Sequence, residues 1–138
     1  MARTASQTPT DGELEILLVL WDRGPSPLGE VCAALRRGRD VATTTVATML
    51  RVMADKGLVR RKGEGRAARW SAAVTHAAAA RSMVGKLVDG IFDGSAQRLV
   101  AHLVEGGRLS ADELAELRML INTGSGKVSR KGAKAQRR

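Results

Sequence analysis

The sequence is poor in aromatic residues, in cysteine and in long apolar runs. Its 138 residues include no tyrosine, one phenylalanine and two tryptophans. Readers of RNA and single-stranded DNA stack bases on several aromatic side chains, so the composition argues against that class. The single cysteine, Cys32, excludes an intrachain disulfide and suits a reducing cytoplasm. The longest apolar run, 16–21, has six residues, so we expect a cytoplasmic protein without membrane insertion.

The sequence also lacks the motifs that catalysis requires. It shows no phosphate-cradling glycine loop, no nucleophile elbow and no paired-carboxylate pocket. His76 and His102 are far apart in sequence and have no partner ligand at metal-binding spacing. Cys32 lies in an apolar stripe, which favours an inert buried thiol over a redox sensor. We therefore expect no enzyme activity, no catalytic residue, no metal and no cofactor.

Positive charge is concentrated in two segments of the chain. The formal net charge is +9 and the sequence pI is about 11.0. Residues 40–70 contain seven basic and three acidic residues, and residues 122–138 contain six basic residues and no acidic one. Residues 75–121 are nearly balanced, with five basic and six acidic residues. Such clustering favours a nucleic acid as partner.

Three short helices are expected after a flexible N-terminus of residues 1–9. Thr10 and Glu13 have the spacing of a capping box, and Ser26 before Pro27 predicts a second cap. The first helix reaches about Asp22, and its predicted inner face is Leu14, Leu17, Leu18 and Trp21. The third helix covers 40–55, and its predicted inner face is Val46, Met49, Leu50 and Met53.

A β-hairpin is expected after the third helix. Residues 58–62 and 66–71 flank the three-residue loop Gly63-Glu64-Gly65, which is typical of a hairpin. Strand alternation places Trp70 against the helices and Arg69 towards solvent or phosphate. Three helices followed by a basic hairpin indicate a winged helix-turn-helix, here a DNA-binding domain over 10–74 that enters the major groove.

The outer face of the third helix carries small hydroxyl side chains, which can approach base edges, and its flanks carry cations for phosphates. Base contacts are expected from Thr44, Thr45 and Thr48, and a phosphate contact from Arg51. The alternative for each of these residues is an ordinary solvated surface. The predicted DNA-binding residues are Thr43, Thr44, Thr45, Thr48, Arg51, Arg60, Lys62, Arg66 and Arg69.

Residues 75–122 predict a second, helical domain. Thr75, Ser95 and Ser110 are candidate N-caps, and Ser110 with Glu113 forms a second capping box. The apolar stripes of these helices need a partner surface, and a symmetric homodimer provides one. The predicted dimerisation residues are Val84, Leu87, Val88, Ile91, Leu99, Leu103, Leu117 and Ile121. Residues 123–138 predict a disordered basic tail, so the expected fold is mainly α with a small β-hairpin wing.

The chain contains, in this order, Thr45-Val-Ala-Thr48-Met-Leu50, Lys56-Gly57-Leu58, Gly65-Arg66, Trp70 and Ser110-x-x-Glu113-Leu114-x-x-Leu117. These motifs resemble those of the penicillinase-repressor (BlaI/MecI) family of winged-helix repressors, with Trp70 in place of the family's Tyr. The resemblance covers about residues 10–121. It implies a homodimer on an inverted-repeat operator in double-stranded DNA, β-lactamase or cell-wall-stress genes as targets, and induction through a membrane-bound sensor protease.

Three positions depart from the family pattern. Ala42 replaces the common Ser at the N-cap of the third helix, and Val52 replaces a common Arg near its end. His102-Leu103 stands where staphylococcal members are cleaved at Asn-Phe, which argues against cleavage at this bond. We predict a sequence-specific repressor. The alternative is a non-specific architectural (nucleoid-associated) protein that relies on phosphate contacts and the tail.

Overall fold

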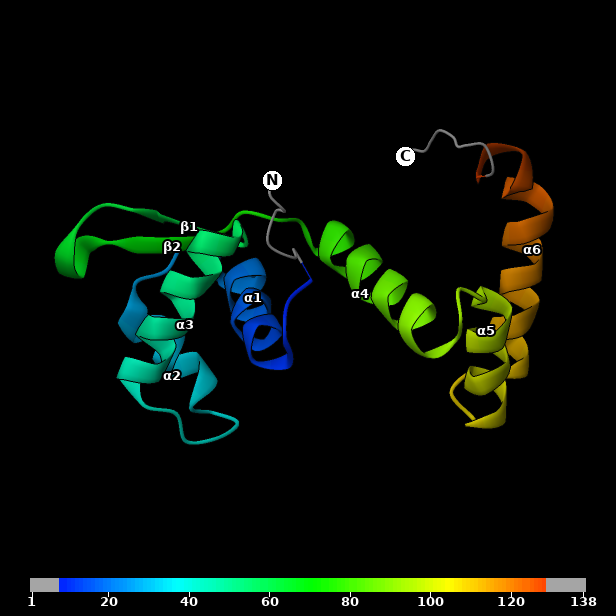
Figure 1. Ribbon diagram of the computed structural model, residues 1–138, viewed down its shortest axis with the longest axis horizontal. Coiled ribbons are helices and arrows are strands. Elements are labelled where there is room, and N and C mark those ends of the chain that lie inside the picture. The colour runs from blue at the N-terminus through cyan, green and yellow to red at the C-terminus, as the bar shows by residue number, and fades with distance from the viewer. Residues whose placement is uncertain (1–7, 129–138) are drawn as a thin grey trace. The chain divides into compact units, whose positions relative to one another are not determined.

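The computed structural model describes residues 8–128, which form six α-helices and one antiparallel hairpin (Figure 1). The predicted class, mainly α with a small hairpin wing, is confirmed. Contacts divide the chain into two compact units, Met1–Leu87 and Val88–Arg138. The elements in chain order are α1 (Asp11–Arg23), α2 (Leu28–Leu35), α3 (Thr43–Lys56), β1 (Val59–Lys62), the 3-10 turn η1 (Gly65–Ala67), β2 (Arg69–Ala72), α4 (His76–Ile91), α5 (Ala96–Glu105) and α6 (Ala111–Val128).

Helix α1 begins at the predicted capping box. The Thr10 hydroxyl accepts from the Glu13 amide at 3.2 Å, and the Glu13 carboxylate accepts from the Thr10 amide at 3.0 Å. The predicted inner face of this helix was partly wrong, because Leu18 is 49% exposed while Ile16 and Leu20 are buried. Almost every position from 14 to 21 is apolar, so periodicity alone does not select the face that packs.

The core of the first unit lies where α1, α2 and α3 meet the base of the hairpin. Its fully buried side chains include Leu17, Val31, Leu50 and Leu58. Val46 and Met53 are also buried and Met49 is half-buried, so the predicted inner face of α3 is confirmed.

Ser26 does not cap α2, contrary to the prediction. Helix α2 begins at Leu28 with Pro27 as its N-cap and without a side-chain cap. The Ser26 hydroxyl donates instead to the Gly24 carbonyl at 2.9 Å. The Ser26 backbone exchanges two hydrogen bonds with Trp70, at 2.9 and 2.8 Å, so the segment before α2 pairs with β2. This pairing holds the hairpin against the helices.

The hairpin has a longer loop than predicted. Lys62 pairs with Arg69 and Arg61 with Trp70, so residues 63–68 connect the strands instead of three residues. Gly63 and Gly65 both have positive φ, and a Cβ on Gly63 would lie 3.3 Å from the Ala67 carbonyl oxygen. The two glycines let the chain turn twice, so Arg66 lies in η1 and not in β2.

A buried ion pair joins the start of α1 to the end of α3. The Lys56 Nζ lies 2.8 Å from the Glu13 carboxylate, and Glu13 is only 5% exposed. Burial raises the pKa of Glu13, but hydrogen bonds from Lys56 and Thr10 outweigh burial and hold the pKa below its ordinary value. The ionised form of Glu13 therefore stabilises the first unit.

The second unit shows the predicted caps. The Ser95 hydroxyl accepts from the Arg98 amide at 3.2 Å, and Ser110 and Glu113 form both bonds of a capping box, at 3.1 and 3.0 Å. Helix α6 extends to Val128, beyond the predicted start of the tail at residue 123. The rest of the predicted tail, 129–138, lies outside the described residues. Within residues 8–128, no helix is long and apolar enough to cross a membrane.

Glu13→Gln keeps a cap-forming side chain but removes the charge that pairs with Lys56. We expect the free energy of unfolding at pH 7 to fall by about 1–3 kcal/mol. Because the folded pKa is depressed, this stabilisation is full above the unfolded value, about pH 4.3, and is lost as pH falls through the folded pKa. Urea unfolding at pH 7 and pH 3 should show the difference from wild type shrinking at low pH.

Glu15→Gln is the matched control for that experiment. Glu15 pairs with Arg39 at 2.6 Å, but both side chains are about half exposed, so the loss should be much smaller. An equal loss for both variants, or a Glu13→Gln loss that is independent of pH, would contradict the role of the buried pair.

Candidate nucleic-acid interface

The outer face of α3 presents the predicted threonines to solvent. Thr44, Thr45, Thr48 and Arg51 are exposed, on the side of the helix opposite the buried core residues. Val52 is 42% exposed on the same side. Ala42 is the N-cap and makes no side-chain cap, as the sequence indicated. The face therefore offers hydroxyl and methyl groups with one guanidinium, which suits the edges of bases in a major groove.

Thr43 is positioned by a residue that the sequence analysis did not single out as a site residue. The Arg36 guanidinium donates to the Thr43 hydroxyl at 2.8 Å and to the Val41 carbonyl at 3.0 Å. Arg36 lies at the end of α2 and thereby fixes the turn that leads into α3. No sequence signal distinguishes Arg36 from Arg37 beside it, because only the fold brings Thr43 within reach.

The wing has two chemically different faces. Directly opposed residues of an antiparallel pair lie on the same side of the sheet, and neighbours along a strand alternate. Arg60, Lys62 and Arg69 therefore share the outer face, whereas Arg61 shares the other face with Trp70 and the buried Val59. The Arg61 guanidinium lies 6.0 Å from the centre of the Trp70 ring, a cation–π distance. Trp70 is buried against the core, as predicted.

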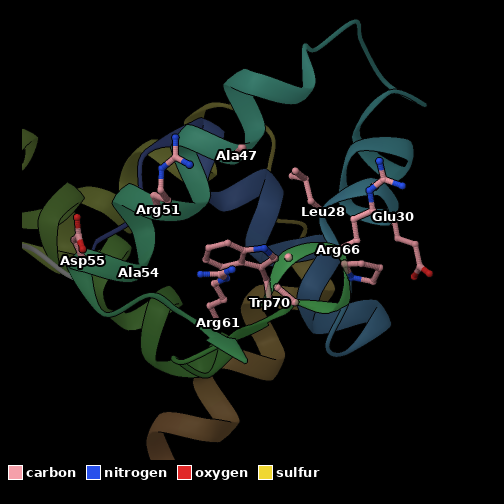
Figure 2. A pocket seen from close by; sticks show the side chains of 13 residues that line it. Leu28, Glu30, Ala47, Arg51, Ala54, Asp55, Arg61, Arg66 and Trp70 are labelled. Carbon is pink, nitrogen blue, oxygen red and sulfur yellow. The ribbon is translucent and has the colours of Figure 1, made fainter. Parts of the chain in front are cut away.

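A groove of about 860 Å³ lies between α2, α3 and the wing (Figure 2). We call it the α2–wing groove and define it by Leu28, Ala47 and Ala54 from the helices and by Ala68 and Trp70 from the wing. It brings together Arg51 and Arg66, which the sequence predicted as DNA contacts, and Arg61, which it did not. The four predicted wing cations thus do not form one cluster, because Arg66 faces this groove and the other three lie on the outer face.

The cations of this region are free of acidic partners within the described part of the chain. The ion pairs among residues 8–128 involve Arg39, Lys56 and Arg98. The guanidinium and ammonium groups on α3's outer face and on the wing therefore form no ion pair with any carboxylate of these residues. Unpaired cations beside a hydroxyl-rich helix are suited to phosphates. In the same range, no group of three or more His, Cys, Asp or Glu residues could hold a metal ion.

The helices after the wing leave large apolar side chains exposed. Of the predicted dimerisation residues, Val84, Leu87, Ile91, Leu117 and Ile121 are exposed, and Val88, Leu99 and Leu103 are half-buried. Met119 and Leu120, which the prediction omitted, are 66% and 65% exposed. Consecutive apolar residues from 119 to 121 cannot all face one side of a helix, so the exposed surface is broader than a single stripe.

Comparison with known proteins shows which proteins this chain is similar to. A family model described as penicillinase repressor matches residues 9–123. The transcriptional regulator BlaI of Mycobacterium tuberculosis is 37% identical over 116 residues, which cover 80% of this chain and 81% of that protein. The methicillin resistance regulatory protein MecI of Mammaliicoccus sciuri is 22% identical over 113 residues, or 82% of this chain and 92% of that protein. A mutant of Lactococcus lactis ZitR is similar in structure, with a TM-score of 0.43 and 14% identity over 91% of this chain and 80% of that chain.

Three packed helices with a hairpin wing, and a matching family of regulators, define the class as winged-helix transcription regulators. Within this class, the chain belongs to the penicillinase repressor family. The resemblance drawn from the residues of α3, the wing and α6 is thereby confirmed.

Proposed function

We propose that this protein is a transcriptional repressor that binds an inverted-repeat operator as a homodimer and blocks transcription sterically. The observation that carries the proposal is the exposed threonine face of α3, flanked by cations that have no acidic partner among the described residues. The relatives named above are regulators of transcription and of methicillin resistance. Genes for β-lactamase or for the response to cell-wall stress are the corresponding proposed targets.

In this proposal α3 supplies specificity and the wing supplies affinity. Thr44, Thr45 and Thr48 contact base edges in the DNA major groove, and Arg51 holds a phosphate at the margin of that DNA groove. The outer face of the wing holds further phosphates through Arg60, Lys62 and Arg69. Thr43 has a supporting role, because its hydroxyl already accepts from Arg36. The proposal places the protein in the cytoplasm, with the DNA, and assigns it no catalytic activity.

Dimerisation would cover the apolar surface of α4, α5 and α6. Ile91, Met119, Leu120 and Ile121 are each 64–70% exposed, and large apolar side chains left in solvent in this number favour association with another surface. An inverted repeat in DNA has twofold symmetry, so a twofold dimer presents one α3 to each half-site. The rival architectural function needs no such match between protein and DNA symmetry.

Inactivation by a sensor protease at His102-Leu103 would require local unfolding. The bond lies within α5, where the His102 carbonyl accepts from the Gly106 amide at 2.9 Å and the Leu103 carbonyl from the Arg108 amide at 2.9 Å. The His102 ring also lies against Phe92, with centroids 5.2 Å apart. These contacts support a route of induction that does not begin with cleavage of this bond.

Thr45→Ala and Thr48→Ala test the role of α3. Each should weaken binding to the operator by about 1–3 kcal/mol, the value of a well-made base contact, while binding to random DNA changes little. Fluorescence anisotropy with operator and scrambled duplexes at one salt concentration measures both affinities. A parallel loss of both affinities would favour the architectural alternative.

Ile121→Asp tests the dimer surface. Ile121 is 64% exposed, so an Asp at this position leaves the packing of one chain intact but places a charge in the proposed interface. We expect the wild type to sediment as a dimer at micromolar concentration and the variant to dissociate. Leu18→Asp, at a 49% exposed position in α1, is the matched control and should remain dimeric. A monomeric wild type would refute the dimer.

A further inference from the structure

The α2–wing groove has an apolar floor that no described side chain fills. Ala47 and Ala54 lie seven residues apart on one side of α3, and their short side chains leave the hollow. Leu28 of α2 and Ala68 and Trp70 of the wing complete the floor. The volume of about 860 Å³ falls within the roughly 300–1,000 Å³ of small-molecule sites.

Three guanidinium groups line the same groove. Arg51, Arg61 and Arg66 make no ion pair within the described residues, and Glu30 and Asp55 are the acidic residues of the lining. In Figure 2 the Arg61 side chain lies beside the Trp70 ring, whereas the carboxylates of Glu30 and Asp55 lie towards opposite edges of the view. The groove thus carries one net positive charge, and a guanidinium lies directly at its aromatic wall.

This combination identifies the chemistry of a ligand. An apolar floor beside a tryptophan ring suits a planar aromatic ring system. Guanidinium groups bind carboxylates through two parallel hydrogen bonds. We propose that the α2–wing groove binds a small aromatic carboxylic acid and that the bound acid lowers the affinity for DNA. The second half of this proposal rests on the proposed function.

Competition with DNA follows from shared residues. Arg51 belongs both to the groove and to the exposed face of α3, and Arg66 lies at the tip of the wing. An acid bound in this groove would place a negative charge beside Arg51, which DNA phosphates would otherwise meet. By linkage, DNA must lower the affinity for the acid by the same factor. The groove would therefore serve as an inducer site that requires no proteolysis.

The test is a titration of the DNA-free protein with 1-naphthoate, followed by NMR. The chain has two tryptophans, so the indole N–H signal of Trp70 is assigned by its persistence in Trp21→Phe. We expect this signal to shift saturably with 1-naphthoate, and the neutral analogue 1-naphthylmethanol to bind at least about fivefold more weakly because it lacks the charge-assisted bonds. No shift of the Trp70 signal, or equal binding of acid and alcohol, would overturn the ligand site.

Arg61→Ala and Arg60→Ala form a matched pair of variants. Both remove one positive charge from adjacent positions of β1, but only Arg61 lines the groove. Arg61→Ala should weaken 1-naphthoate binding at least about fivefold, and Arg60→Ala less than about twofold. Equal losses would show that the acid responds to the general positive field, and would overturn the site. Ala54→Leu, which fills the floor, should abolish binding.

Competition is measured by anisotropy with a labelled duplex. Saturating 1-naphthoate should lower the DNA affinity of the wild type and leave that of Ala54→Leu unchanged. If the acid binds at Trp70 without affecting DNA, the inducer role is wrong. If the protein shows no sequence preference among duplexes, the proposed function fails, yet the NMR titration still decides whether the groove binds the acid.

Discussion

The packing of the inner face of α3 is the constraint on which the rest of the first unit depends. Threonine is a poor helix former, and three in succession cost roughly 1–2 kcal/mol relative to alanine. Burial of Val46, Leu50 and Met53 offsets this cost, since each fully buried side chain of this kind contributes about 1.5–3 kcal/mol. Because tertiary contacts hold α3, its outer face can carry hydroxyl side chains that do not favour helix formation.

Sequence reasoning succeeded where the determining contacts are local. The capping boxes at Thr10 and Ser110 lie within four consecutive residues, and the inner face of α3 follows from helical spacing. It failed where distant segments decide. Ser26 pairs with Trp70 instead of capping α2, and pairing of Lys62 with Arg69 lengthens the wing loop. Arg60 and Arg61 lie on opposite faces because neighbouring residues alternate along a strand, and the pairing of Arg61 with Trp70 shows which of the two shares a face with the ring.

The two units differ in how far their apolar side chains are buried. The first unit has a closed apolar core and an exterior with unpaired cations. The described residues of the second unit bury few side chains and expose many apolar ones. In the proposed dimer, a second copy of the chain would cover these apolar side chains. The penicillinase repressor family model matches residues 9–123, so the match includes residues of both units. The α2–wing groove adds a proposed ligand site that includes Arg51, a residue also proposed to hold DNA.

The most direct test of the central claim is selection of the full-length protein's binding sites from a pool of random DNA duplexes. Sequence reading by α3 within a twofold dimer predicts that selection converges on an inverted repeat whose half-site centres are about one helical turn, or a whole number of turns, apart. The selected duplex should bind two chains. A selected pool without any shared motif, bound with the same affinity as the starting pool, would contradict the account and leave a non-specific DNA-binding protein.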